Sequence, residues 1–407
     1  MKIVLFEDNQ CDTIRPAGLF KPLFELQIAS WTLYDMVQLL DLPVLTIVRD
    51  HFLFGEHTNP DIKSSGDDSL LFLNASVEPD CAYLKIIRDL ARSGDPFIST
   101  SGNRVASAFI PPGKVFPESI STHTVSSILL EMGLPLEREL FRTIDWPHMI
   151  VESHARLFDS NIENRIATGN YRETEKGIFT NGEVEISPTC VFETKKGPVV
   201  IESGVNVMPF TYIEGPVYIN HDTRIIEHSS IKDRTGIGSG CKIGGEIEVS
   251  TIEPHSNKQH HGFLGHSWVG SWVNLGAGTS TSDLKNTYGN VRMDYGGTRM
   301  DTGMQFLGSI IGDFVKTAVN TSFFTGKLIG TCSLIYGMVT TNIPSFSNYA
   351  RSFGQITEIS LEQVIITQKR MFSRRGVTQT PYDIELAKRI FEITRNERII
   401  SDEQINF

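Results

Sequence analysis

The chain has 407 residues, which is enough for two or three domains of ordinary size. It carries 37 lysine and arginine residues against 48 aspartate and glutamate residues, a net charge of −11, and a chain this acidic repels nucleic-acid phosphates and anionic membranes. Its hydrophobic content of 40% and charged content of 21% are typical of folded proteins and exclude a mostly disordered chain.

The five cysteines are far apart and form no Cys-x-x-Cys pair, so neither a disulfide framework nor a zinc ribbon is predicted. The first residues lead directly into a short apolar run without a basic segment or a cleavage site, and no stretch approaches ~18 uninterrupted apolar residues. We therefore expect a cytoplasmic protein that has no signal peptide and no membrane span.

Short apolar runs alternate with amphipathic stretches in the first part of the chain. The runs predict strands and the stretches predict helices, in the order Lys2–Phe6, Trp31–Leu40, Val44–Val48, Leu70–Leu73, Ala82–Leu90, Val105–Ile110 and Thr122–Met132. This order favours a largely parallel sheet with helices on its faces, which binds ligands at the carboxyl ends of its strands. A polar, asparagine-rich passage at His154–Tyr171 follows, and a different pattern begins near Glu183.

That second pattern is a six-residue repeat. Nine consecutive positions six residues apart hold valine or isoleucine: Ile201, Val207, Ile213, Ile219, Ile225, Ile231, Ile237, Ile243 and Val249. Such a repeat indicates a hexapeptide β-helix, in which three short strands form a coil and the aliphatic residues stack inside a triangular prism. The phase breaks at residues 250–262 and 280–305, which predicts two loops that protrude from the prism. The glycines that crowd this half are expected at coil corners.

From Ser360 onward the repeat gives way to helical periodicity. Thr380 followed by Pro381 predicts a helix start, with Thr380 as the N-cap. Because stacked repeats need a covered end, we interpret this segment as a cap on the last coil.

Four of the eleven histidines lie between His255 and His266. Histidine titrates nearest neutral pH, so a histidine beside a bound amine can take its proton during attack on a carbonyl. Three interpretations stay open on the residues alone: solvated histidines, a general base, or a metal site. No cysteine or carboxylate at ligand spacing strengthens the metal interpretation.

The runs His260-His-Gly-Phe-Leu-Gly265 and Val273-Asn-Leu-Gly-Ala-Gly-Thr279 resemble a family of bifunctional enzymes. Those enzymes join an N-acetylglucosamine-1-phosphate uridylyltransferase to a glucosamine-1-phosphate N-acetyltransferase. The stretches Cys241–Glu246, Ser256–His260 and Ser282–Asn286 resemble a divergent bacterial branch of that family. The resemblance covers almost the whole chain in architecture, but its motifs are specific only over residues 232–337.

The resemblance implies the hand of the β-helix, the domains and the assembly. We expect an α/β nucleotidyltransferase-like domain at residues 1–180, a left-handed parallel β-helix acyltransferase domain at 185–350 and a C-terminal helical segment at 351–407. It also implies a homotrimer, in which the sugar amine lies between two β-helices and attacks the thioester of acetyl-CoA.

The resemblance also implies roles for individual residues. His260 falls on the general base of the family, with its neighbour His261 as the alternative. Asn274 would hold the sugar or orient the histidine, and Phe263 replaces a tyrosine, keeping the ring without the hydroxyl. Ala277, Gly278 and Ala318 would contact acetyl-CoA, with backbone amides near the acetyl carbonyl. The other candidates for the sugar phosphate are Lys232, Arg234, Asn257, Lys258, Asp283, Lys285 and Arg292.

The nucleotide site departs further from the family. Arg15 and Lys21 match, in type and order, the cations that neutralise nucleotide phosphates, here those of UTP or dTTP. The glycine-rich loop is absent, and the acidic residues near Arg15 would repel phosphate. Asn74 stands where an aspartate ligand of Mg²⁺ is expected, and a neutral amide is a poorer ligand for this ion. The domain is therefore either an altered nucleotidyltransferase or a scaffold.

Two functions of different class follow. The first is an acetyl-CoA-dependent N-acetyltransferase of an amino-sugar phosphate, fused to a sugar-1-phosphate nucleotidyltransferase-like domain, in the biosynthesis of UDP-N-acetylglucosamine. The second is a trimeric scaffold or sensor whose N-terminal domain binds a nucleotide sugar without catalysis. A protruding loop that carries His260 favours the enzyme, because a scaffold has no use for it.

Overall fold

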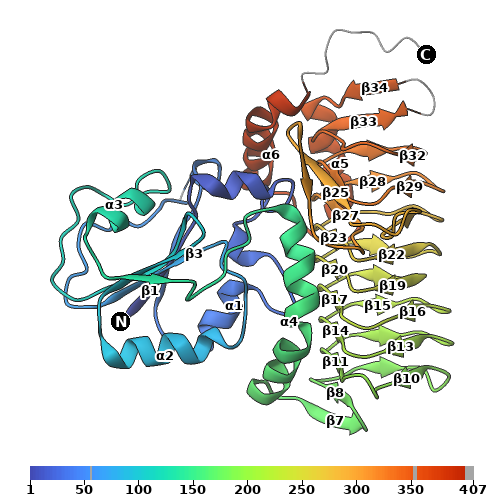
Figure 1. The fold of residues 1–407 in the computed structure, drawn as a ribbon. Helices are drawn as coiled ribbons and strands as arrows, with labels where there is room; N and C mark the ends of the chain where they lie inside the picture. The colour runs from blue at the N-terminus through green and yellow to red at the C-terminus, as the bar shows by residue number, and fades with distance from the viewer. Residues whose placement is uncertain (56, 352–354, 399–407) are drawn as a thin grey trace. The chain divides into compact units, whose positions relative to one another are not determined.

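The structure is a computed structural model, and it describes residues 1–55, 57–351 and 355–398. Its contacts divide the chain into two compact units, which Figure 1 colours from blue to red along the sequence. The first unit comprises Met1–Leu26 and Trp31–Trp146, and the second comprises Gln27–Ser30 and the chain from Pro147 onward. No helix in the described ranges combines the length and the apolar composition that a membrane span requires.

The first unit is built on a six-stranded sheet in the order β2-β1-β3-β5-β4-β6. Its strands are β1 (Lys2–Phe6), β2 (Val44–Ile47), β3 (Leu70–Asn74), β4 (Phe97–Ser101), β5 (Arg104–Ile110) and β6 (Leu136–Arg138). Strands β1, β2 and β3 are parallel, but β5 runs antiparallel to both β3 and β4. The sheet is therefore mixed rather than largely parallel, because a tight turn at Gly102 joins β4, which was not predicted, to β5 as a hairpin. The helices are α1 (Leu33–Gln38), α2 (Tyr83–Ser93) and α3 (Val125–Glu131).

The second unit starts with a long helix, α4 (Pro147–Thr168), that contains most of the polar passage His154–Tyr171. Its buried face includes Leu157 and Phe158 but also the polar His154 and Asn161, which interrupt the apolar periodicity. The side chains of His154 and Phe158 pack closely over Gly236 of the β-helix, where a Cβ would lie 3.5 to 3.6 Å from them. Packing thus stabilises a helix that hydrophobic pattern alone did not reveal.

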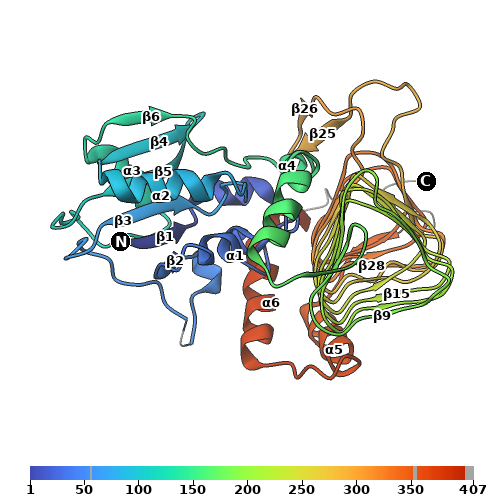
Figure 2. The ribbon, with the colours of Figure 1, turned by 90° about the horizontal axis from the view of Figure 1, so that it is seen from below.

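The rest of this unit is the predicted left-handed parallel β-helix, seen end on in Figure 2. Sheet 1 lies under α4 and comprises β7 (Arg172–Glu175), β8 (Ile178–Thr180), β11 (Val199–Ile201), β14 (Val217–Ile219), β17 (Thr235–Ile237), β20 (Thr251–Ile252), β23 (Trp268–Val269), β27 (Ser309–Ile311) and β30 (Lys327–Ile329). Sheet 2 comprises β9 (Glu185–Ile186), β12 (Asn206–Val207), β15 (Arg224–Ile225), β18 (Lys242–Ile243), β21 (Asn257–Lys258), β28 (Lys316–Thr317), β31 (Leu334–Ile335), β33 (Ser347–Ala350) and β34 (Gln355–Glu358). Sheet 3 comprises β10 (Val191–Glu193), β13 (Tyr212–Glu214), β16 (Ser230–Ile231), β19 (Glu246–Glu248), β22 (Phe263–Gly265), β24 (Ser280–Thr281), β29 (Ser322–Phe323) and β32 (Met338–Val339).

The six-residue repeat predicts the interior of the prism well. The aliphatic positions from Ile201 to Ile243 are all buried, and they stack in register across parallel strands, as Ile225 does on Ile243. The ninth position is an exception, because Val249 lies at a corner with φ 43° and Ile247 takes the inward place instead. Each buried Val or Ile contributes roughly 1.5 to 3 kcal/mol, so the columns are the main source of stability in this unit.

The first phase break is not a protruding loop. Ile243 stacks on Lys258, 15 residues later, whereas inward residues of regular coils such as Ile225 and Ile243 are 18 apart. Residues 250–262 therefore form a shortened coil within the prism, including β20 and β21. The second break is a loop as predicted, and it carries the antiparallel hairpin of β25 (Arg292–Tyr295) and β26 (Thr298–Asp301).

The C-terminal segment forms α5 (Leu361–Ser373) and α6 (Pro381–Ile393). The predicted start of α6 is confirmed, since the Thr380 hydroxyl accepts the Asp383 amide and Asp383 caps the Thr380 amide in return. The interpretation as a cap on the last coil is wrong for α5. Phe372 of α5 packs on Trp272 and Phe314, which belong to inner coils, so this helix lies along the side of the prism.

A pH-dependent contact fixes α4 to the β-helix. Nδ1 of His154 accepts the Ala29 amide at 3.1 Å, and its Nε2 donates to the Arg234 carbonyl at 2.7 Å. Burial lowers the pKa of His154 to about 4, and the hydrogen bond to Arg234 offsets this only in part.

We therefore expect His154 to make the second unit sensitive to acid. Because the folded pKa lies below the ordinary value of 6.5, its contribution is complete above pH 6.5 and is lost as the pH falls towards 4. Wild type should lose about 2 kcal/mol more unfolding free energy between pH 7 and pH 5 than His154→Gln does. Urea unfolding at both pH values measures this, and equal losses in the two proteins would contradict it.

Candidate functional site

The corner between sheets 2 and 3 collects the residues expected to carry out acetyl transfer. His260 and His261 lie at this corner on one coil and are exposed, and Ala277 and Gly278 occupy it on the next coil. The Gly278 amide donates to the His261 carbonyl at 3.1 Å, and the Asn320 amide donates to the Ala277 carbonyl at 2.7 Å. Ala318 precedes Asn320 on the following coil. We call this line of corners, formed by residues 259–262, 276–279 and 318–321, the His260 edge.

Glycine is needed on the His260 edge where coils approach closely. Gly278 has φ 75°, and a Cβ there would collide with Oδ1 of Asn320 and lie 3.3 Å from Nε2 of His261. A Cβ at Gly262, with φ 124°, would collide with the Thr279 carbonyl. The Gly278 amide already donates to the His261 carbonyl, so a backbone donor to an acetyl carbonyl at this corner would be a different amide.

Lys258 does not face a substrate. Its side chain is 3% exposed and occupies the interior column between Ile243 and Leu275, at a position that elsewhere holds an aliphatic residue. Nζ donates to the carbonyls of Gly244 and His260, both at 3.0 Å. Burial lowers the pKa of Lys258 to about 8, and the charge of Glu246 offsets this only in part. Lys258 thus holds the backbone of His260 from inside the prism.

Two asparagines lie on the outer side of sheet 2 near this edge. Asn257 Nδ2 donates to Asn274 Oδ1 at 3.4 Å, and Asn257 Oδ1 accepts Nη2 of Arg375 at 2.6 Å. Arg375 follows α5 and is a contact that sequence reasoning missed. Phe263 begins β22 on sheet 3, and its ring covers Gly265.

The structure does not gather the other expected phosphate contacts on the His260 edge. Lys232 is paired with Glu246, and also with Glu248 at 3.6 Å. Arg234 is paired with Asp159 at 2.7 Å and Asp233 at 3.4 Å. Lys285 Nζ donates to the Asn290 carbonyl at 2.9 Å, and Arg292 Nε lies 3.8 Å from Asp301 Oδ2, both within the second loop.

Asp283 takes part in a different cluster. Its Oδ2 lies 2.8 Å from Nδ1 of His266, and a carboxylate oxygen of Glu248 is the third ligand atom, so that the ligand atoms of all three residues lie within 4.8 Å of one another. A histidine and two carboxylates form a donor set that can hold a divalent cation. Sequence spacing could not reveal this cluster, because the two carboxylates are 18 and 17 residues from the histidine and only coil stacking brings them together.

Two acidic residues of the N-terminal unit, Glu7 and Asp12, are neutralised by arginines, of which Arg49 is distant in sequence and Arg15 is near. Glu7 Oε1 accepts Nη2 of Arg49 at 3.0 Å, and Asp12 accepts Nη1 of Arg49 at 3.0 Å and Nη2 of Arg15 at 2.9 Å. Burial raises the pKa of Asp12, but Arg15 and Arg49 outweigh it and leave the pKa below its ordinary value. Glu7 and Asp12 therefore do not present the unpaired negative charge that the sequence suggested, and Arg15 is already paired. Lys21 lies in the same unit and is half-buried.

Asn74 lies at the end of β3, fully buried, and both ends of its amide are engaged. Nδ2 donates to Asp8 at 2.7 Å and to the Val105 carbonyl at 2.9 Å, while Oδ1 accepts the amide and hydroxyl of Ser76. Asp8 is in turn held by Nη2 of Arg104 at 2.6 Å and Nε at 3.0 Å. These donor sets do not fit a Mg²⁺ ion at Asn74, because no oxygen of Asn74 or Asp8 is left to coordinate it.

Comparison with known proteins supports the resemblance. Residues 3–168 match a family model described as Sugar nucleotidyl transferase. The chain is 35% identical over 143 residues to the bifunctional sugar-1-phosphate nucleotidylyltransferase/acetyltransferase of Sulfurisphaera tokodaii, across 35% of this chain and 36% of that protein. It is 33% identical over 229 residues to the bifunctional protein GlmU of Methanococcus vannielii, across 51% of each. The chain spans about a quarter to a half of the length of the curated relatives it matches.

One solved structure, a UDP-N-acetylglucosamine acyltransferase from Francisella novicida, aligns with 54% of this chain and 84% of that chain. The sequence identity is 15% and the TM-score is 0.32. These values are too low to bear on substrate or mechanism.

Proposed function

We propose, from the sugar nucleotidyl transferase domain at residues 3–168 and the geometry of the β-helix, that this chain is an acetyl-CoA-dependent N-acetyltransferase of an amino-sugar phosphate. The observation that carries the proposal is the His260 edge, where an exposed histidine and the small residues Ala277, Gly278 and Ala318 line up on successive coils. The printed names of the relatives, which pair nucleotidylyltransferase with acetyltransferase, support it. The pathway would be nucleotide-sugar biosynthesis.

In the proposed mechanism the sugar amine attacks the thioester carbonyl of acetyl-CoA while His260 accepts the amine proton. A carbon–nitrogen bond forms, the carbon–sulfur bond breaks, and the leaving thiolate takes up the proton. Lys258 holds the His260 carbonyl from inside the prism, and the small residues of the edge leave room for the acetyl thioester of acetyl-CoA. His260 is exposed in the single chain, which agrees with a site that a second β-helix completes in the predicted homotrimer. The cytoplasmic location also stays a prediction.

For the N-terminal domain we propose sugar-1-phosphate nucleotidyl transfer from UTP or dTTP, with Arg15 and Lys21 as the phosphate contacts. Both ends of the Asn74 side-chain amide are hydrogen-bonded within the protein, so Asn74 is not available as a metal ligand. This favours a second candidate function, a domain that binds a nucleotide sugar without catalysis. If Mg²⁺ takes part, its ligands are other than Asn74 and Asp8.

Incubation of the full chain with acetyl-CoA and glucosamine-1-phosphate, and separately with UTP or dTTP and sugar-1-phosphates, tests both activities. Thiol release reports acetyl transfer and pyrophosphate release reports nucleotidyl transfer. We expect thiol release. Its absence across a panel of amino-sugar phosphates would overturn the acetyltransferase, and thiol release without pyrophosphate would favour the non-catalytic N-terminal domain.

Lys258 offers a sharper test of the His260 edge. Lys258→Met removes a charge from the apolar column, so stability should stay equal or rise, while kcat for acetyl transfer should fall roughly 10- to 100-fold because the His260 backbone loses its anchor. Lys316→Met is the matched control, since burial also lowers the pKa of Lys316 to about 8 and its Nζ donates to the Phe314 carbonyl instead. Equal kcat values in the two variants would show that Lys258 does not position His260.

A further inference from the structure

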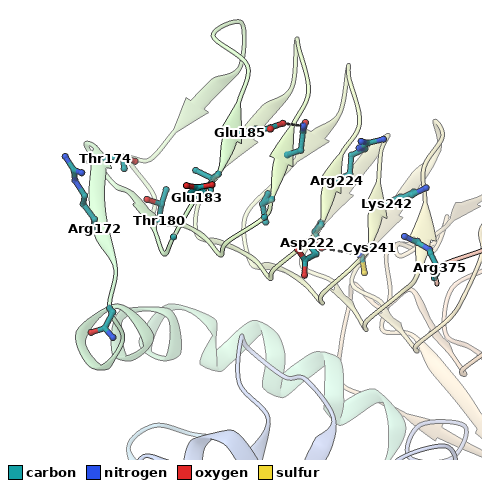
Figure 3. A pocket seen from close by; sticks show the side chains of 17 residues that line it. Arg172, Thr174, Thr180, Glu183, Glu185, Asp222, Arg224, Cys241, Lys242 and Arg375 are labelled. Carbon is teal, nitrogen blue, oxygen red and sulfur yellow. Dashed lines mark hydrogen bonds between the residues drawn. The ribbon is translucent and has the colours of Figure 1, made fainter. Parts of the chain in front are cut away.

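A groove of about 980 Å³ runs along the outer side of sheet 2 over the first coils of the β-helix (Figure 3). All the residues that line it belong to the second unit. Arg224, Lys242 and Arg375 line one end of it, and Glu183 and Glu185 lie between them and the β7 end, as Figure 3 shows. His260 is not among the lining residues, so the groove is separate from the His260 edge.

Three of the four cations that line this groove, Arg224, Lys242 and Arg375, stand next to one another, and the described part of the chain places no counter-ion beside them. Arg224 and Lys242 are paired in register on the neighbouring strands β15 and β18. Arg375 reaches Asn257, which is the next partner of Lys242 in the same ladder. Among the described residues, no carboxylate lies within ion-pair distance of any of the three, whereas Lys196, Lys232 and Arg234 of the same β-helix each have one.

This arrangement is unfavourable for the protein alone. Like charges that face each other on adjacent strands destabilise a sheet. Burial lowers the pKa of Lys242, and the charges of Arg375, Arg224 and Arg374 lower it further. Burial and the charge of Arg374 also lower the pKa of Arg375. The chain as a whole has a net charge of −11, yet these three cations have no carboxylate within ion-pair distance among the described residues. Their mutual repulsion lowers the stability of the fold, and their positive potential favours the binding of an anion.

Acceptors line the groove between this cluster and its β7 end, where a fourth cation, Arg172, lies (Figure 3). The carboxylate of Glu185 accepts a hydrogen bond from Asn206, and the Glu183 carboxylate and the Thr180 side chain line the groove beside it. Carboxylate oxygens accept hydrogen bonds from hydroxyl groups and repel phosphates. The groove therefore suits a molecule whose phosphate lies on the three clustered cations and whose hydroxyl groups reach the neighbouring carboxylates.

We propose that this groove binds a phosphorylated, hydroxyl-rich small molecule, with its phosphate or diphosphate group on Arg224, Lys242 and Arg375 and its hydroxyl groups on Glu183 and Glu185. Both sugar phosphates and nucleoside diphosphates have this chemistry. The site lies outside the machinery proposed for acetyl transfer, and binding to it is measured without any assay of activity.

Thermal unfolding of the full chain with inorganic diphosphate, uridine diphosphate or glucosamine-1-phosphate tests the groove. The double variant Arg224→Gln/Lys242→Gln should unfold at a higher temperature than wild type without ligand, because the repulsion is relieved. It should bind diphosphate roughly 100-fold more weakly, about tenfold for each cation removed. The control Lys195→Gln removes an exposed lysine outside the groove and should behave as wild type.

The outcomes separate the possibilities. A ligand-induced shift in wild type that the double variant loses supports the site, and the ligand with the larger variant-dependent shift identifies the sugar phosphate or the nucleotide as the source. Any shift that the double variant retains comes from the other proposed sites, so a double variant that shifts as much as wild type overturns the proposal, as does the absence of any shift in wild type. Whether or not the groove binds a phosphate, the acetyl-transfer assay can give a positive or a negative result. The groove and the acetyltransferase are therefore tested independently.

Discussion

Replacing His260 by alanine is expected to lower kcat for acetyl transfer by about 10² to 10⁴, the range that a general base contributes. The side chain is exposed at a coil corner and donates no hydrogen bond to any described residue, so its removal should leave the fold and the assembly intact. Thiol release from acetyl-CoA gives the rate, and light scattering gives the mass of the assembly. An activity close to that of wild type would refute the assignment of the base.

His261→Ala is the matched control for this experiment. His261 shares the coil and the exposure of His260, but its carbonyl accepts the Gly278 amide and its ring lies over Gly278. If His260 is the base, His261→Ala should keep the pH profile of wild type and lose activity only through weaker binding. If His261→Ala carries the larger loss in kcat, the base is His261. A monomeric mass for wild type would contradict a site between two prisms.

Removing Arg104 is expected to destabilise the N-terminal unit strongly. Arg104 is 1% exposed and donates to Asp8 from Nη2 and Nε, to Asp145 at 3.2 Å and to the Ile144 carbonyl. Burial raises the pKa of Asp8, but Arg104 and Asn74 outweigh it and keep the carboxylate ionised. Arg104→Met leaves that buried charge without its partner, which costs about 3 to 5 kcal/mol.

Urea unfolding of the full chain, followed by a probe in the first unit, measures this loss. The control Arg92→Met removes an exposed arginine paired with Asp89 and should change stability by about 0.5 kcal/mol or less. Adding Asp8→Asn to Arg104→Met should restore part of the loss, because the uncompensated charge is gone. Equal stability of the two single variants would show that the buried pair contributes nothing.

The elements that periodicity predicted and those that it missed differ in how their side chains are buried. Strand β1 and the six-residue repeat are predicted well, since each buries aliphatic residues at a regular spacing. Helix α4 was missed because its buried face carries the polar residues His154 and Asn161, and the hydrogen-bonding partners of His154 lie in other parts of the chain. The shortened coil was misread as a loop because Lys258 occupies an interior position that the repeat reserves for aliphatic residues.

The sequence by itself determined the parallel β-helix, the α/β unit before it and the start of α6 at its N-cap Thr380. Local spacing and capping chemistry act between residues that are near in sequence. It also singled out His260 and the small residues of the next coils. Only the tertiary structure decided which charges meet. Contacts between residues distant in sequence create the Glu248–His266–Asp283 cluster, the pairing of Glu7 and Asp12 with Arg49, and the cation cluster of Arg224, Lys242 and Arg375. Charges interact through space, and the fold alone fixes the distances on which that interaction depends.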